Sequence, residues 1–175
     1  EKLLSLVKVS DYLKFLDANE NQRPVTIRVN TIRTHTNDLR QNLNDRGVRL
    51  EPIPWNKLGL IVVESQVPVG ATPEYLSGHY MLQSPSSFLP VIALNPTPDS
   101  RVLDMCAAPG GKTTHMAQLM KNKGTIIAND FTTSRCSALV ANIHRLGVTN
   151  AIVVNYNGLA FPDIMGGFDY VLCDA

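Results

Sequence analysis

The feature that most constrains this 175-residue chain is a short apolar run that leads through a glycine turn into a helix. Residues 103–105 have the pattern of the end of a buried strand, and Gly110 and Gly111 follow shortly afterwards. Because glycine has no Cβ, a ligand can lie against this backbone, and the free N–H groups of the next helix point toward it. The turn is therefore predicted to hold an anionic group, either a carboxylate or a phosphate.

Three ligand classes compete for such a turn, and the spacing separates them. A phosphate-binding P-loop needs a further glycine where this chain has Cys106, and Pro109 lacks an N–H group that would bind phosphate. Residues 107–112 do not have the dinucleotide spacing either. The remaining class is S-adenosylmethionine, because the next predicted strand ends at Asp130, whose carboxylate can accept ribose hydroxyls. An ordinary strand-to-helix turn, with Asp130 as a cap, stays open as the alternative.

The second part of the chain alternates between strand and helix patterns. The predicted strands cover 101–105, 125–129, 151–155 and 168–174, and the predicted helices cover 113–122 and 132–146. Such alternation favours an α/β fold with a parallel, doubly wound sheet. Right-handed connections would place the polar residues that end these strands on one rim, namely Asp104, Asp130, Asn157 and Asp174.

The first part is predicted to be a small α+β unit. Strands are expected at 25–30 and 58–63, with a helix at 36–46 that Gly47 ends, and short amphipathic helices at 1–18. Turn-forming residues are frequent over 67–78, so we place a boundary near Ser77. The chain is thus expected to divide into units at 1–77 and 78–175, with 80–94 as a helix-bearing lead-in to the second.

Composition narrows the class of protein without identifying a function. With 44% hydrophobic and 18% charged residues, the chain can form a packed core, and it has neither a membrane-spanning apolar run nor a signal-peptide pattern. Cys106, Cys136 and Cys173 lack metal-ligand spacing, so we expect buried thiols and no metal site.

The first unit is rich in arginine and poor in nearby acids. The arginines are Arg23, Arg28, Arg33, Arg40, Arg46 and Arg49. Charge alone leaves two interpretations open, an ordinary solvated surface or a stripe that faces RNA.

Four motifs in this order closely resemble the Nop/Nol/Sun family of RNA cytosine-5 methyltransferases. They are residues 23–31, 78–87, 104–113 and 142–150. The resemblance implies the first half of a Rossmann-like methyltransferase sheet after a small RNA-contacting unit, with S-adenosylmethionine as cofactor and ribosomal RNA as substrate. It also implies a role in ribosome assembly in the nucleolus. A non-catalytic assembly factor that binds pre-ribosomal RNA is the alternative.

The resemblance also assigns roles in cofactor binding. The backbone of Cys106, Ala107, Ala108, Pro109, Gly110, Gly111 and Lys112 would cradle the methionine end of the cofactor. Asp130 would bind the ribose, and Asn157 would contact the adenine edge. The family usually has Asp at the position of Asn157, so we expect somewhat weaker cofactor binding here. Arg135 either positions the Asp130 carboxylate or is a solvated helix residue.

Lys112 and Asp174 are the candidate catalytic residues. Lys112 could reach the substrate base or pair with Asp174, which in the family holds the amidine edge of cytosine and borders the cofactor. Solvated or capping roles remain the alternatives for both. Methylation of carbon-5 requires a thiolate, and the family places its two cysteines beyond the position of Ala175. This part of the protein is therefore expected to be inactive alone, with strand 168–174 as an exposed sheet edge.

Overall fold

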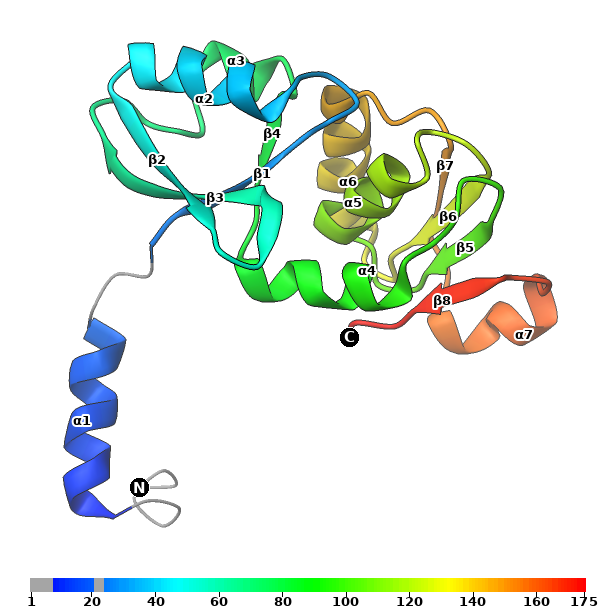
Figure 1. The fold of residues 1–175 in the computed structure, drawn as a ribbon. Coiled ribbons are helices and arrows are strands. Elements are labelled where there is room, and N and C mark those ends of the chain that lie inside the picture. The colour runs from blue at the N-terminus through cyan, green and yellow to red at the C-terminus, as the bar shows by residue number, and fades with distance from the viewer. Residues whose placement is uncertain (1–7, 21–23) are drawn as a thin grey trace.

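The computed structural model of this chain describes residues 8–20 and 24–175, which form two sheets that lie side by side (Figure 1). The first sheet is antiparallel with the strand order β2-β3-β1-β4. Its strands are β1 (Thr26–Val29), β2 (Val48–Ile53), β3 (Asn56–Ser65) and β4 (Tyr80–Leu82). The helices of this unit are α1 (Val9–Glu20), α2 (Thr36–Asp45) and α3 (Pro73–Leu76). The predicted α+β character of the first unit is confirmed.

Helix α1 stands away from both sheets (Figure 1). It corresponds to the end of the amphipathic segment predicted at 1–18, of which residues 1–7 lie outside the described residues. Within residues 8–20 and 24–175, no helix is long and apolar enough to cross a membrane.

Two strands of the first sheet were not predicted. Strand β2 pairs with β3, but its register shifts at Arg49/Leu50 and again at Pro52/Ile53. Such irregularities break the alternation on which strand prediction relies, which explains why β2 was missed. Strand β4 was wrongly assigned to the lead-in of the second unit, because three residues are too few for a periodic pattern. The division of the chain near Ser77 stays a prediction, and the first sheet extends beyond it.

Helix α2 covers the first sheet and builds its core. Leu39 and Leu43, one helical turn apart, are fully buried against Ile27, Val29 and other apolar side chains of the sheet. The helix ends at Asp45, shortly before Gly47, as the sequence predicted.

The second sheet is parallel, with the strand order β7-β6-β5-β8, which confirms the predicted α/β fold. Its strands are β5 (Arg101–Asp104), β6 (Thr125–Asn129), β7 (Ala151–Val154) and β8 (Tyr170–Leu172). The helices of this part are η1 (Pro85–Phe88), α4 (Leu89–Leu94), α5 (Gly111–Leu119), α6 (Thr133–Leu146), η2 (Gly158–Ala160) and α7 (Phe161–Ile164). The helical lead-in expected before β5 is present as η1 and α4.

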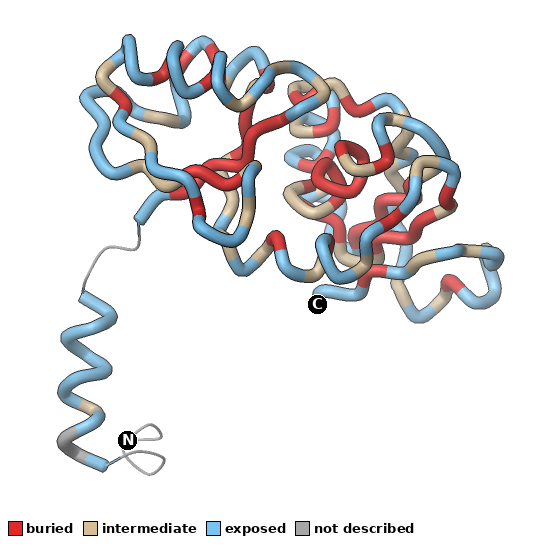
Figure 2. Tube along the Cα trace, viewed as in Figure 1, coloured by how far each residue is buried: buried red, intermediate tan, exposed pale blue. Residues whose placement is uncertain are grey.

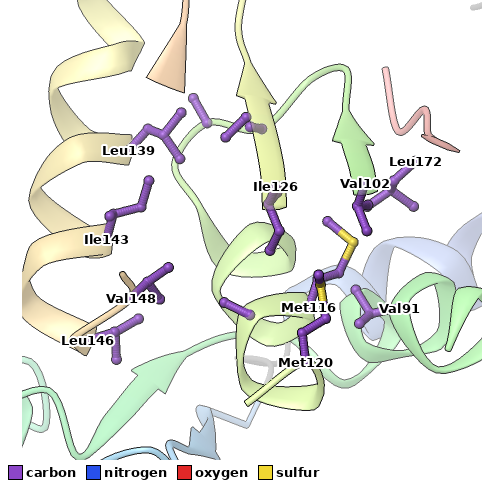
Figure 3. Close-up of a cluster of buried hydrophobic side chains, with 14 of the residues drawn as sticks. Val91, Val102, Met116, Met120, Ile126, Leu139, Ile143, Leu146, Val148 and Leu172 are labelled. Atoms are coloured by element: carbon purple, nitrogen blue, oxygen red, sulfur yellow. The ribbon is translucent and has the colours of Figure 1, made fainter. Parts of the chain in front are cut away.

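The two faces of the parallel sheet carry separate cores. Val102 on β5 packs with α4, α5 and α6 on one face, and the next residue, Leu103, packs with Phe161 of α7 on the other. Figure 3 shows the larger core, where Met116 of α5 and Met120, which follows its last residue, lie between the sheet and α4. This alternation along β5 is what a strand covered on both faces requires.

Strand β8 forms one edge of this sheet, as predicted for residues 168–174. Val171 at this edge is 47% exposed. On the α7 face, side chains around Leu103, Phe161 and Phe168 line an apolar hollow of about 350 Å³. Figure 2 shows the contrast between the buried central strands and the exposed tube at β8 and α7.

Buried polar contacts join the two units. The Asn30 side-chain amide, which follows β1, donates to Gly78 O and to Leu146 O at the end of α6, both at 2.8 Å. The Arg145 guanidinium lies 4.0 Å from the centre of the Tyr75 ring and donates to Tyr75 O at 2.7 Å. Main-chain groups of the first unit are therefore held against the end of α6.

Gly78 lies at the tightest point of this junction. Its φ is +74°, and a Cβ there would lie 1.9 Å from the carbonyl oxygen of Arg145. We predict that Gly78→Ala lowers the free energy of unfolding by about 2 kcal/mol or more, because both the backbone strain and the clash oppose it. Urea denaturation measures this, with Gly166→Ala as the control, since a Cβ at Gly166 meets nothing within 4 Å. Equal losses in the two variants would contradict the prediction.

Candidate functional site

The predicted ligand turn joins β5 to α5 at the carboxyl end of the parallel sheet. Gly110 has a φ of +99°, and a Cβ there would lie 3.0 Å from the Leu139 side chain. The Gly110 N–H donates to Ala107 O at 2.7 Å, and α5 begins at the next residue. Asn142 of α6 donates to Pro109 O at 2.9 Å. Glycine at position 110 therefore permits a sharp entry into the helix, whose first N–H groups have no partner within the helix.

A pocket of about 560 Å³ opens in front of this turn. One wall is the turn itself, and the opposite wall is the segment from β4 to η1. The predicted site residues that line the pocket are Cys106, Ala107, Ala108, Pro109, Gly111, Lys112, Arg135 and Asp174. Gly110, Asp130 and Asn157 were predicted with them but do not line it. The structure thus gathers most of the predicted site around one cavity.

Asp130 lies behind the turn and is 2% exposed. Its carboxylate accepts the N–H of Ala108 at 3.1 Å and the N–H of Thr132 at 3.0 Å. An Arg135 nitrogen lies 3.6 Å from the same carboxylate, and Arg135 also donates to Ala108 O at 2.7 Å. In this arrangement Asp130 and Arg135 support the turn together, and contact with a ribose stays a prediction for Asp130.

Asn157 is exposed and lies at the start of η2. Its side-chain oxygen accepts the N–H of Leu159 at 3.0 Å, so the side chain caps its own short helix. The predicted contact with an adenine edge stays a prediction, and the cap explains why Asn157 is held outside the pocket lining.

Lys112 and Asp174 form an ion pair, with 2.5 Å between Lys112 Nζ and Asp174 Oδ2. Pairing with Asp174 was one of the two roles that the sequence suggested for Lys112. The side chains are 21% and 50% exposed respectively, so the pair lies at the pocket surface. The N-terminal end of a helix disfavours a cation, and the Asp174 carboxylate offsets this for Lys112 in the first turn of α5.

Asp104 is buried beneath this pair, with 1% exposed. Thr113 donates its hydroxyl to the Asp104 carboxylate at 2.7 Å. Burial raises the pKa of Asp104 to about 6, with a further rise from Asp174, whereas Thr113, Lys112 and the Cys106 N–H act in the opposite direction. Desolvation is therefore stronger than the local hydrogen bonds at this position.

The three cysteines are free thiols, and the prediction that they are buried was wrong for Cys173, which is exposed. Cys106 and Cys136 are partly buried. Burial raises the pKa of Cys106, and the nearby Cys173, Asp130 and Asp104 raise it further, so its thiol is protonated at neutral pH. Among the described residues, no three His, Cys, Asp or Glu side chains are grouped so that they could hold a metal ion.

Sequence reasoning missed the second wall of the pocket. Gln83, Ser84 and Ser87 line it, and the Ser84 hydroxyl lies 3.1 Å from that of Ser87. The motif at 78–87 carried the signal, because it has adjacent polar side chains just before a helix, but no role was assigned to them.

Only some of the arginines in the predicted stripe are exposed at the surface. Arg28 is buried and donates a hydrogen bond to the glycine turn, so it is not available for contact with RNA. Arg46 donates to both carboxylate oxygens of Glu74 at 2.9 Å. The exposed arginines are Arg33, Arg40, Arg49 and also Arg46 despite its pair with Glu74, whereas Arg23 lies outside the described residues. The error arose because the alternating pattern of β1 does not reveal what packs on each face of the strand.

Two family models match the chain in the same order as the two sheets. The N-terminal domain of 16S rRNA methyltransferase RsmF matches residues 1–85, and 16S rRNA methyltransferase RsmB/F matches residues 91–175. This chain belongs to the RsmB/F family of rRNA cytosine-C5 methyltransferases. The predicted resemblance to RNA cytosine-5 methyltransferases is confirmed.

Two relatives of this RsmB/F-family chain match it over nearly all of its length. The 25S rRNA (cytosine-C(5))-methyltransferase nop2 of Schizosaccharomyces pombe is 61% identical over 177 residues, which cover 100% of this chain and 29% of that protein. The 28S rRNA (cytosine(4447)-C(5))-methyltransferase of Homo sapiens is 58% identical, over 99% of this chain and 22% of that protein. The chain therefore spans less than a third of the length of these two relatives.

A solved structure confirms the fold. A methyltransferase homologue from Pyrococcus horikoshii superposes with a TM-score of 0.83 at 38% identity, over 89% of this chain and 51% of that one. The RsmB/F-family chain thus has an antiparallel unit followed by the parallel sheet of the methyltransferase fold.

The buried Asp104 makes a pH-dependent contribution to stability. Its pKa is about 6 in the folded chain and 3.8 for an unperturbed carboxyl, so the folded state binds more protons between these values. Stability from this residue is therefore present at low pH and is lost as the pH rises through 6. We predict that Asp104→Asn gains about 2 kcal/mol relative to the native chain between pH 4.5 and pH 7.5.

Urea denaturation of both chains at the two pH values measures this gain. A difference in unfolding free energy between native and variant that does not change with pH would show that Asp104 does not titrate in this range.

Proposed function

We propose that this chain is the cofactor- and RNA-contacting part of an enzyme that methylates carbon-5 of cytosine in ribosomal RNA, with S-adenosylmethionine as methyl donor. The observation that carries the proposal is one pocket that has the glycine turn on one side and the Lys112–Asp174 pair at its surface. Family membership and two relatives named for rRNA cytosine-C5 methylation support the same reaction.

The residues at the turn fit S-adenosylmethionine. Gly111 borders the pocket, where a Cβ would lie 3.4 Å from the Gln83 side chain and narrow the space between the walls. The free N–H groups at the start of α5 suit the methionine carboxylate, and Lys112 and Arg135 add positive charge. When bound, S-adenosylmethionine supplies the methyl group. Asp130 would take the ribose and Asn157 the adenine edge.

Lys112 and Asp174 would hold the target base beside the cofactor. A carboxylate accepts hydrogen bonds from the exocyclic amine of cytosine, and the Lys112 ammonium donates to oxygen acceptors. Because Asp174 is half exposed, it can exchange part of its ion pair for the base without leaving a buried charge unpaired.

Carbon-5 of cytosine becomes nucleophilic only after a thiolate adds to carbon-6. Cys106 borders the pocket, but its raised pKa keeps it protonated, and Cys136 and Cys173 do not line the pocket. We therefore expect residues 1–175 to bind cofactor and RNA without methylating RNA, the nucleophile being supplied by another part of the whole protein.

RNA would contact the first unit at a hollow of about 270 Å³ between α2 and β2. The residues that line it are Asn37, Arg40, Gln41, Asn44, Arg49 and Leu50, none of which is acidic. Two arginines among amide side chains suit the RNA backbone, where most contacts are to phosphate oxygens. The relatives from Schizosaccharomyces pombe and Homo sapiens are named for 25S and 28S rRNA, which supports ribosomal RNA as substrate. We propose that the reaction takes place on pre-ribosomal RNA in the nucleolus.

The cofactor assignment predicts that S-adenosylhomocysteine, the demethylated product, binds this chain and that Asp130→Asn weakens binding about tenfold, because a charged hydrogen bond becomes neutral. Isothermal titration calorimetry measures both dissociation constants. The control is Asp169→Asn, since Asp169 accepts the Arg101 N–H at the opposite end of β5. Equal affinity in native and Asp130→Asn chains would reject the ribose role, and no binding by the native chain would reject the cofactor.

The RNA assignment predicts that the double change Arg40→Glu and Arg49→Glu weakens binding of an rRNA fragment at least about tenfold and flattens its salt dependence, because two phosphate contacts are lost. Fluorescence anisotropy over a salt series measures both effects. Lys121→Glu with Lys123→Glu, which makes the same change in net charge on the second unit, should have a much smaller effect. Equal losses in the two double variants would show that only total charge matters.

A further inference from the structure

Arg28 has an unusual environment for a charged side chain. It lies on β1 in the first sheet, is 1% exposed and is among the largest fully buried side chains of the described chain. Burial, and then the neighbouring Arg145, lower the pKa of Arg28 to about 9, so the guanidinium is still charged at neutral pH. A buried cation costs free energy unless its hydrogen bonds are satisfied.

The hydrogen bonds of Arg28 go to the ligand turn and to the opposite wall of the pocket. Its Nη1 donates to Gly111 O at 2.6 Å and also to the side-chain oxygen of Gln83. Its Nη2 donates to the Thr114 hydroxyl at 2.8 Å, and that hydroxyl donates to Gly110 O at 2.7 Å. The buried Arg28 side chain therefore connects Gly111 on one wall of the pocket with Gln83 on the other.

These acceptors are a carbonyl, an amide and a hydroxyl, so no carboxylate neutralises Arg28 through these bonds. An apolar side chain of similar volume would fill such a space without the cost of a buried charge. Such an apolar side chain could not join Gly111, Gln83 and Thr114, because only the planar guanidinium of arginine offers donors in several fixed directions.

We propose that Arg28 is a positioning residue that holds the turn at Gly110 and Gly111 in its ligand-binding conformation, and so makes cofactor affinity depend on the first unit. The inference rests on the proposed cofactor site. The first sheet would then have a second role besides contact with RNA, because β1 supplies the Arg28 guanidinium that orders the turn. Arg28 itself does not touch the cofactor.

The experiment compares Arg28→Lys, which keeps the charge but loses the fork, with Thr114→Val, which removes one acceptor at nearly constant shape. Arg46→Lys is the matched control, because it breaks a two-bond contact to Glu74 within the first unit. Hydrogen–deuterium exchange of peptides that span 108–115 reports on the turn without any ligand. Titration with S-adenosylhomocysteine reports on affinity.

In Arg28→Lys we expect exchange at the turn to become about tenfold faster and affinity to fall about tenfold, the effect of one lost charged hydrogen bond. Thr114→Val should change both in the same direction, and Arg46→Lys should change neither. If Arg28→Lys does not fold, Thr114→Val and Arg46→Lys carry the comparison.

Exchange and affinity within twofold of native in Arg28→Lys and Thr114→Val would overturn the proposal, and so would an equal effect of Arg46→Lys. If the native chain binds no S-adenosylhomocysteine while exchange at the turn responds as expected, the proposed cofactor function fails and the positioning of the turn by Arg28 is upheld.

Discussion

The close approach of the two units at Gly78 and Asn30 is the contact on which the pocket depends. A glycine with no Cβ lets the first unit lie against the carbonyl of Arg145, and the Asn30 amide donates to main-chain oxygens on both sides of the junction. Because one wall of the pocket follows β4 and the other follows β5, the cavity exists only when the two sheets are joined. The junction is polar and buried, so separation would leave several hydrogen-bonding groups unpaired.

The charges around the pocket are arranged in two levels. At the surface, Lys112 and Asp174 form a partly exposed pair that can exchange partners at small cost. Asp104 and Arg28, in contrast, are almost fully buried. Burial raises the pKa of Asp104 and lowers the pKa of Arg28, so in both cases it favours the neutral form. The surface pair can rearrange, whereas the buried groups favour a fixed geometry, because a buried charge that loses its hydrogen bonds keeps the full cost of its desolvation.

Local pattern predicted a large part of the fold and of the site. The alternation of strand and helix predicted the parallel sheet, because its central strands are covered on both faces and α6 is amphipathic. The glycine turn was located because Gly110 needs a positive φ that few other residues adopt. The prediction failed for β2, where two register shifts interrupt the alternation, and for β4, which has too few residues to show any period.

The sequence by itself determined where the chain turns, which residues end the parallel strands and to which family the chain belongs, because these depend on neighbouring residues and on motifs in order. Only the tertiary structure decided that Arg28 is buried below the turn, that Asp130 lies behind it, and that Gln83 and Ser87 face it across a cavity. These facts depend on contacts between segments far apart in the chain. Burial and charge environment follow from such long-range packing, which the order of residues along one strand does not reveal.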